Sequence, residues 1–113
     1  MNTLRNKVSL IGRLGGQPEV VSLESGTLAR FSLATNESYK NKSGEWQDRT
    51  QWHTIKAWGK TAERVAKALD KGQEVIVEGR IVNTNYTTKE GEKRYSTEIE
   101  ISDFIRLAPA NTA

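Results

Sequence analysis

The sequence predicts an all-β fold, a small five-stranded barrel with one short α-helix that closes one end. Apolar and polar residues alternate over most of the chain, which is the period-two pattern of half-buried strands. Only residues 59–72 show the spacing of a helix. Short turn sequences separate the strands, so we expect consecutive strands to pair antiparallel and the sheet to close, because an open sheet leaves two unpaired edges.

The first part of the chain predicts three strands joined by tight turns. Residues 7–14 alternate apolar and polar side chains, as a half-buried strand requires. Two glycines and a proline mark the first turn, and a Ser-Gly pair marks the second. The second and third strands then form a hairpin. The predicted strands cover residues 7–14, 19–23 and 29–34.

The middle of the chain predicts a projecting segment and then a strand with two different faces. Residues 40–49 are polar, and we expect a long loop or the tip of a ribbon. In residues 51–58, His53, Ile55 and Ala57 share one face, while Trp52 and the other large side chains share the opposite one. The two faces therefore have different environments.

The helix and the last two strands complete the predicted barrel. Apolar residues at helical spacing follow Thr61, a candidate N-cap, and Gly72 is the candidate stop. These apolar residues are Ala62, Val65, Ala66 and Leu69. Two strands follow, over residues 75–86 and 95–107, with a turn near Glu90 and Gly91.

Length and composition exclude several classes of protein. A chain of 113 residues allows one domain, and we expect it to cover residues 1–107, with a short disordered end at 108–113. Without cysteine, and with His53 as the single histidine, no disulfide scaffold, thiol nucleophile, metal or cofactor is expected. No signal peptide or membrane-spanning segment is recognisable, which predicts a cytoplasmic protein. The net charge of +3 mildly favours a polyanionic partner.

Candidate catalytic patterns are absent or have simpler explanations. The Gly59-Lys60-Thr61 segment lacks the first glycine of a phosphate-binding loop, because that position is Thr54. The strand pattern makes His53 a packed residue of the core or of an interface. Glu98 and Glu100 share a strand face and are interpreted as a solvated surface.

Aromatic and basic residues are interleaved between positions 39 and 60. Two of the three tryptophans, Trp52 and Trp58, share the strand face opposite the apolar set. Stacked bases could cover such rings while Lys and Arg hold the phosphates, as in single-strand binding. The alternative, a core or subunit contact, stays open, and the charges of Glu45 and Asp48 favour it for Trp46.

Five segments together resemble the bacterial single-stranded DNA-binding protein family, which has the OB fold. They read NKVSLIGRLGGQPEV, ARFSLATNESYK, TQWHTIKAWGKTAE, KGQEVIVEGRI and TNYTTKEGEKRYSTEI, and the resemblance covers residues 4–107. It implies a non-enzymatic, sequence-tolerant binder of single-stranded DNA in replication, recombination and repair. It also implies a five-stranded OB-fold barrel with one short capping helix.

The resemblance implies site residues as well. The positions of the family's stacking aromatics are Tyr39, Trp52, Trp58 and Tyr86 here. Tryptophan is familiar in the family at the first and last of these, and phenylalanine at the third, but each residue here keeps a flat ring. Nine basic residues are candidates for phosphate contact: Lys7, Arg13, Lys40, Lys42, Arg49, Lys56, Arg80, Lys89 and Arg94.

The same resemblance implies a homotetramer. Its candidate interface residues are Lys7, Val8, Ser9 and Leu10 of the first strand, together with His53. Members usually end in an acidic tip that recruits replication and repair proteins, and the sequence printed here ends without one, which puts that recruitment in doubt. Three alternatives remain open: an accessory protein resembling primosomal replication protein N, an RNA chaperone, and an enzyme of small-molecule metabolism.

Overall fold

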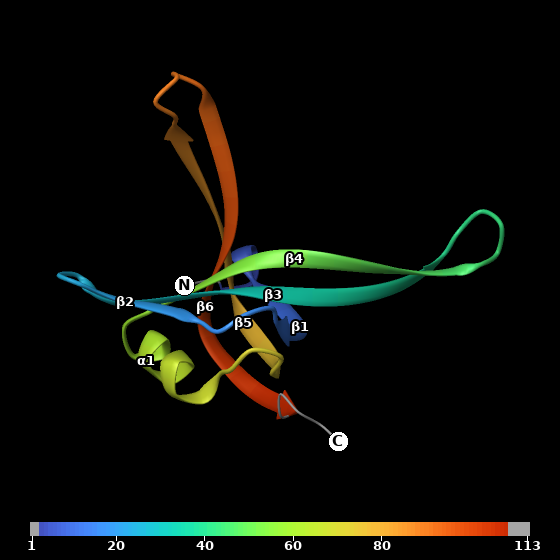
Figure 1. Cartoon of the computed structure of the whole chain (residues 1–113), viewed down its shortest axis with the longest axis horizontal. Helices are drawn as coiled ribbons and strands as arrows, with labels where there is room; N and C mark the ends of the chain where they lie inside the picture. The colour runs from blue at the N-terminus through green and yellow to red at the C-terminus, as the bar shows by residue number, and fades with distance from the viewer. Residues whose placement is uncertain (1–2, 109–113) are drawn as a thin grey trace.

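The structure, a computed structural model, describes residues 3–108. The described residues form six strands and one α-helix; five of the strands form a barrel, from which two long hairpins project (Figure 1). In chain order the elements are η1 (Thr3–Asn6, a 3-10 helix), β1 (Val8–Leu14), β2 (Glu19–Leu23), β3 (Gly26–Lys40), β4 (Trp46–Trp58), α1 (Gly59–Ala68), β5 (Glu74–Thr87) and β6 (Lys93–Ala108).

Five of the strands close into a barrel, as the sequence predicts. The pairing order is β1-β5-β6-β4-β3, and β1 returns to pair with β3 through Arg13 and Leu14. The remaining strand, β2, pairs with β3 alone as the short arm of a hairpin. The expected all-β class, the barrel and the single α-helix are therefore confirmed.

One pairing differs from the expected antiparallel pattern. β4 and β6 run parallel, and only three residue pairs join them, from Thr54↔Glu98 to Lys56↔Glu100. The sequence pattern cannot predict this contact, because the two strands are separated by the helix and by β5. This short parallel contact links the β3–β4 hairpin to the β5–β6 hairpin.

The core is formed by one face of each long strand together with the helix. Ile55 and Ala57 are fully buried, as are Ala62 and Val65 of α1, and Leu69 just after the helix is nearly so. Figure 1 shows α1 at the end of the barrel away from the two projecting hairpins. The helix thus supplies the apolar cover that the barrel end needs.

Three details of the predicted helix are wrong. The helix begins at Gly59 with Trp58 as the N-cap residue and without a side-chain cap, so Thr61 does not cap it. It ends at Ala68, because Leu69 is already extended, and Gly72 lies in the following turn. Ala66 faces solvent instead of the core.

Arg64 ties the helix to the last strand. Its Nη1 donates to Asp103 Oδ1 at 3.0 Å, its Nη2 donates to the Phe104 carbonyl at 3.5 Å, and its guanidinium lies 4.7 Å from the Phe104 ring centroid. The hydrogen bond from Arg64, and then the one from the Phe104 amide, lower the pKa of Asp103 below its usual value.

The two projecting hairpins are named here as arms. The β3–β4 arm comprises residues 35–51 and the β5–β6 arm comprises residues 83–97, since within these ranges each strand pairs only with its hairpin partner. The polar segment at 40–49 is therefore the tip of a ribbon, one of the two expected forms. The arms leave the barrel in different directions (Figure 1).

The expected domain boundary at residue 107 falls within β6, which runs to Ala108. The rest of the expected C-terminal end, residues 109–113, lies outside the described residues, as do residues 1–2. No helix within residues 3–108 is long and apolar enough to span a membrane.

Candidate nucleic-acid interface

Register places alternate residues of four strands on one surface, which we call the outer face. Ser32 lies opposite Thr54, Thr54 beside Glu98, and Glu98 opposite Val82, so one row of side chains crosses β3, β4, β6 and β5. Paired residues of neighbouring strands point to the same side of a sheet. The outer face thus extends over the barrel and along both arms.

Four exposed aromatic rings belong to the outer face. Trp52 and Trp58 are 62% and 40% exposed, and Tyr86 is 54% exposed on the β5–β6 arm. Trp46 is 70% exposed near the tip of the β3–β4 arm, opposite Lys40. Trp46 therefore does not pack in the core, and the expectation of a core contact is wrong. The other expectation, a contact with a second subunit, stays a prediction.

Tyr39, the fourth expected stacking residue, belongs to the opposite face. It pairs with Gln47, the residue next to Trp46 on β4. Neighbouring residues of a strand point to opposite faces, so Tyr39 points away from the face that holds Trp46 and Trp52. The Arg49 guanidinium lies 4.7 Å from the centroid of its ring. One side of Tyr39 is therefore already covered by a cation. Trp52, Trp58 and Tyr86 thus share the outer face, and Tyr39 lies on the opposite one.

Trp52 is held at the base of the β3–β4 arm by the turn after β1. Its six-membered ring packs against Gly15 so closely that a Cβ on that glycine would lie 2.5 Å from Cζ3. Gly16, the next residue, has open space around it. The Gly15-Gly16 turn therefore provides a flat backbone surface that fixes one edge of the indole ring.

Most of the candidate phosphate-binding residues already have partners. Lys7, Lys56, Arg80 and Arg94 form ion pairs with Glu78, Glu98, Glu100 and Glu92, at 3.8, 3.0, 3.3 and 2.9 Å. Arg13 Nη1 donates to the Gly72 carbonyl at 2.9 Å. Exposed ion pairs contribute little to stability, so a phosphate can compete for Lys7, Arg80 and Arg94. The Lys56–Glu98 pair is more buried, with side chains 26% and 12% exposed.

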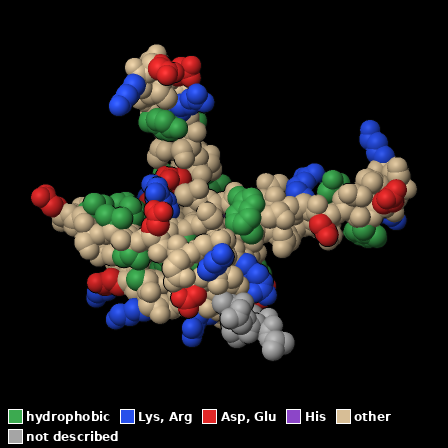
Figure 2. Space-filling model, in the orientation of Figure 1, with side chains coloured by type: hydrophobic (Ala, Val, Ile, Leu, Met, Phe, Trp, Pro, Cys, Tyr) green, Lys and Arg blue, Asp and Glu red, His purple; other side chains and the backbone are tan. Residues whose placement is uncertain are grey.

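Three candidate lysines form no ion pair within residues 3–108: Lys40, Lys42 and Lys89. Lys40 and Lys42 lie at the tip of the β3–β4 arm, and Lys89 lies in the turn of the β5–β6 arm. Figure 2 shows blue basic side chains at both tips, beside acidic ones. The three candidate lysines without a carboxylate partner thus lie at the ends of the arms.

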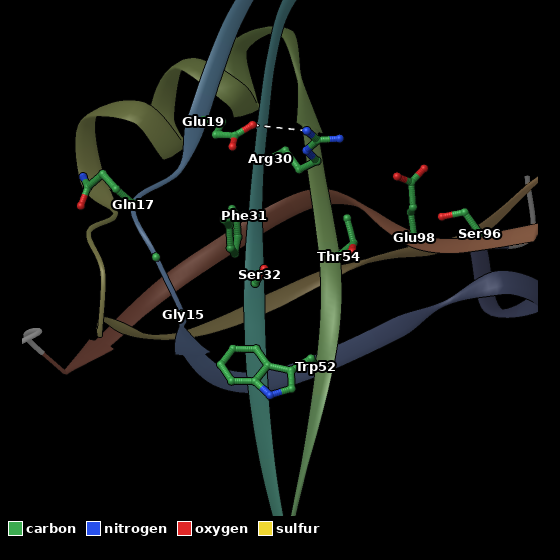
Figure 3. Close-up of a pocket in the computed structure, with 11 residues that line it drawn as sticks. Gly15, Gln17, Glu19, Arg30, Phe31, Ser32, Trp52, Thr54, Ser96 and Glu98 are labelled. Atoms are coloured by element: carbon green, nitrogen blue, oxygen red, sulfur yellow. Dashed lines mark hydrogen bonds and ion pairs between the residues drawn. The ribbon is translucent and has the colours of Figure 1, made fainter.

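A cavity of about 500 Å³ adjoins Trp52 on the outer face. Figure 3 shows Trp52 at one end of it and Arg30 at the other, where Arg30 pairs with Glu19 at 3.3 Å. Its remaining lining residues are Gly15, Gly16, Gln17, Phe31, Ser32, Thr54, Ser96 and Glu98. Sequence reasoning missed Arg30, Ser32 and Thr54 as site residues, because a strand pattern does not reveal a hollow formed by side chains of different size.

Two other expectations concern Glu98 and His53. The Glu98 side chain is only 12% exposed, because it pairs with Lys56, so the interpretation of Glu98 as solvated is wrong. His53 is half-buried, and its Nε2 lies 3.0 Å from Thr35 Oγ1. It is thus a packed histidine, as expected. Within the described chain no group of three or more His, Asp and Glu residues could hold a metal ion.

Comparison with known proteins identifies the family. A sequence model described as the "Single-strand binding protein family" matches residues 5–107. The chain belongs to this family. Among its relatives, Single-stranded DNA-binding protein 1 of Chlorobaculum tepidum is 46% identical over 90% of this chain and 64% of the relative. Single-stranded DNA-binding protein 1 of Xylella fastidiosa is 42% identical over 90% of this chain and 76% of the relative.

Solved structures of the single-strand binding protein family share the fold. A structure titled "Plasmodium falciparum SSB complex with ssDNA" has a TM-score of 0.85 and 34% identity, covering 91% of this chain and 95% of that one. A deletion mutant of the single-stranded DNA binding protein from Thermus aquaticus has a TM-score of 0.81 and 25% identity, over 91% of this chain and 50% of that one. The barrel described above is therefore the OB fold of this family.

Proposed function

We propose that this chain binds single-stranded DNA without strong dependence on sequence, through the outer face. The observation that carries the proposal is the set of exposed rings, Trp52, Trp58 and Tyr86, on a surface that also bears basic residues. Membership of the single-strand binding protein family and the likeness to a Plasmodium protein solved with single-stranded DNA support it.

Binding would combine stacking with charge neutralisation. Each base that stacks on a ring contributes about 1–3 kcal/mol, and it does so for every base because every base has a flat face. The phosphates would contact basic residues among the nine candidates, such as Lys40, Lys42 and Lys89 at the arm tips, whereas Arg49 lies with Tyr39 on the opposite face of the β3–β4 arm. Cations that now pair with glutamates would exchange a carboxylate for a phosphate, whereas the lysines at the arm tips have no carboxylate to release.

Tryptophan fluorescence during titration with oligo-dT tests the proposal. We expect strong quenching by oligo-dT and little quenching by duplex DNA, because a duplex offers no free base faces. The affinity should fall with salt with a log–log slope between about 2, for three phosphate contacts, and about 6, for nine. Absence of quenching at low salt would contradict single-strand binding. Stronger binding of poly-U than of poly-dT would instead favour an RNA chaperone.

We further propose a homotetramer in which the Lys7–Leu10 segment and His53 contact other subunits. Residues 8–12 of β1 pair only with β5 within the described chain, so their other edge has free backbone groups. Ile11, Ile76 and Ile105 form a neighbouring apolar row, in which Ile11 and Ile105 are 56% and 62% exposed. Such an apolar row favours an interface. Light scattering should give four times the mass of the 12.7 kDa chain, and a monomer mass would refute the proposal.

The cellular role we propose is the coating of exposed single strands during replication, recombination and repair, at the nucleoid in the cytoplasm. No catalytic activity is included in this proposal, and binding of replication and repair proteins stays a prediction. A docking protein like primosomal replication protein N is the main alternative. Weak binding of oligo-dT together with tight binding of a protein partner would favour it.

A further inference from the structure

The cavity beside Trp52 lies between an aromatic ring and a row of charged side chains. Register places Arg30 opposite Lys56 and Lys56 beside Glu100, and this row continues to Glu19 at one end and Arg80 at the other. The row with Ser32, Thr54 and Glu98 lies between the charged row and Trp52. Two short hydroxyl side chains thus separate two sets of long side chains, which leaves a slot.

The width of this slot suits one stacked ring. Side chains on one face of a strand repeat every two residues, or about 6.6 Å, so Trp52 and Lys56 are separated along β4 by about 13 Å. Stacked aromatic rings lie with their centroids about 4.5–7 Å apart. A nucleobase on Trp52 therefore fits before the charged row is reached. The cavity volume of about 500 Å³ also accommodates the attached sugar.

The side chains on the floor and the far wall of the slot determine which chemical groups of a ligand the slot accepts. The hydroxyl groups of Ser32 and Thr54 can donate or accept, so they tolerate any base edge. Glu98 accepts only: Oε2 lies 3.0 Å from Lys56 Nζ, while Oε1 has no hydrogen-bond partner within residues 3–108. Glu19 and Glu98 both line the slot, each paired with a cation, Arg30 and Lys56, so the lining carries no net positive charge that would attract a phosphate.

We propose that the slot is a subsite for a single nucleobase, which stacks on Trp52 and donates an amino hydrogen to Glu98. Such a carboxylate accepts the N4 amino group of cytosine, whereas the O4 of uracil or thymine offers it only a second acceptor. The subsite adds a preference for amino-bearing bases to the otherwise sequence-tolerant binding. It rests on the proposed function, because the base arrives as part of a single strand.

The test compares labelled oligo-dC and oligo-dU by fluorescence anisotropy at slightly alkaline pH. The two bases have the same ring size and differ only at N3 and at the 4-substituent, so the ratio of their dissociation constants isolates the base edge. We expect the wild-type chain to favour oligo-dC, and Glu98→Gln to reduce that preference about fivefold, because a neutral acceptor is weaker than a charged one. Any general gain from releasing Lys56 affects both oligonucleotides and cancels in the ratio.

Glu100→Gln is the matched control, because Glu100 pairs with Arg80 on the same outer face but does not line the slot. It should leave the dC/dU ratio within about twofold of the wild-type value. A ratio that Glu98→Gln leaves unchanged while both oligonucleotides still bind would overturn the subsite and leave the proposed function intact. Failure of the wild-type chain to bind either oligonucleotide would instead overturn the proposed function.

A second variant keeps the proposal testable if Glu98→Gln does not fold. Ser32 is exposed on the floor of the slot, so Ser32→Leu fills the slot without disturbing the core. We expect this variant to weaken the binding of both oligonucleotides by about tenfold, which corresponds to the loss of one stacked base. Ser22→Leu changes the same residue type at an exposed position of β2, on the face opposite the outer face, and should alter affinity by less than about twofold. Equal effects of the two leucine variants would refute the slot.

Discussion

Replacement of Trp52 by alanine is expected to weaken the binding of oligo-dT by about 5- to 150-fold, the equivalent of about 1–3 kcal/mol for one lost stacking contact. Fluorescence anisotropy of a labelled oligonucleotide measures the change without relying on tryptophan emission. The variant should fold normally, since Trp52 is 62% exposed and lies on the face of β4 opposite the core.

Trp52 should have a larger effect than the other rings because of its position. It lies at the base of the β3–β4 arm, where Ala34 joins it to β3 and Gly15 supports its ring, so little order is lost when a base stacks on it. It also forms one wall of the slot. A ring that is already held in place offers a base more net binding free energy than one on a free arm tip.

Tyr95→Ala is the matched control for this prediction. Tyr95 is the more exposed ring, at 73%, but it pairs with Asn85 on the face of the β5–β6 arm opposite Tyr86. Its replacement should change affinity by less than about twofold. Equal losses from Trp52→Ala and Tyr95→Ala would show that exposure alone, and not the outer face, determines binding. No loss from Trp52→Ala would remove that ring from the interface.

Gly79→Ala is expected to lower the free energy of unfolding by about 3 kcal/mol or more. A Cβ at this position would lie 2.1 Å from the Glu100 carbonyl oxygen and 2.6 Å from Ile101 Cα, and both are backbone atoms that no side-chain rotation can move. Gly79 sits beside an irregularity in the β5–β6 ladder, where β6 holds one extra residue. Relief of the clash would require the two strands to separate at the barrel wall. Chemical denaturation followed by circular dichroism measures the loss.

Gly16→Ala provides the control, because no atom lies within 4 Å of a Cβ built on Gly16. Its stability should stay within about 0.5 kcal/mol of the wild-type value. Should Gly79→Ala unfold at the same denaturant concentration as Gly16→Ala, the close strand contact at Gly79 would be refuted. A Gly79→Ala chain too unstable to purify agrees with the prediction, provided that Gly16→Ala purifies normally.

The sequence predicted the barrel strands well because each of them has one buried face, whereas β2 is exposed along its whole length. Ile55 and Ala57 had to alternate with polar or large side chains once β4 became the wall of a barrel, and that alternation is visible in the residues themselves. The helix ends were less predictable. The first turn of α1 begins directly after β4, so the chain path, and not the cap propensity of Thr61, determines its start.

The candidate site was predicted only in part, for a related reason. Residue type identified flat rings and cations, but their partners come from distant strands. Tyr39 matches a stacking position of the family, yet its register turns it away from Trp52 and toward Arg49. Lys56 is basic, yet Glu98 neutralises it across the parallel β4–β6 contact.

By itself, the sequence determined the elements, the separation of core from surface, and the resemblance to a single-strand binding family. These follow from local periodicity and from residue types in a fixed order. Only the tertiary structure decided which rings share the outer face, which cations are already paired, and that Ser32, Thr54 and Trp52 enclose a slot. Closure of the barrel brings together strands that are far apart in the chain, and no local pattern contains those distances.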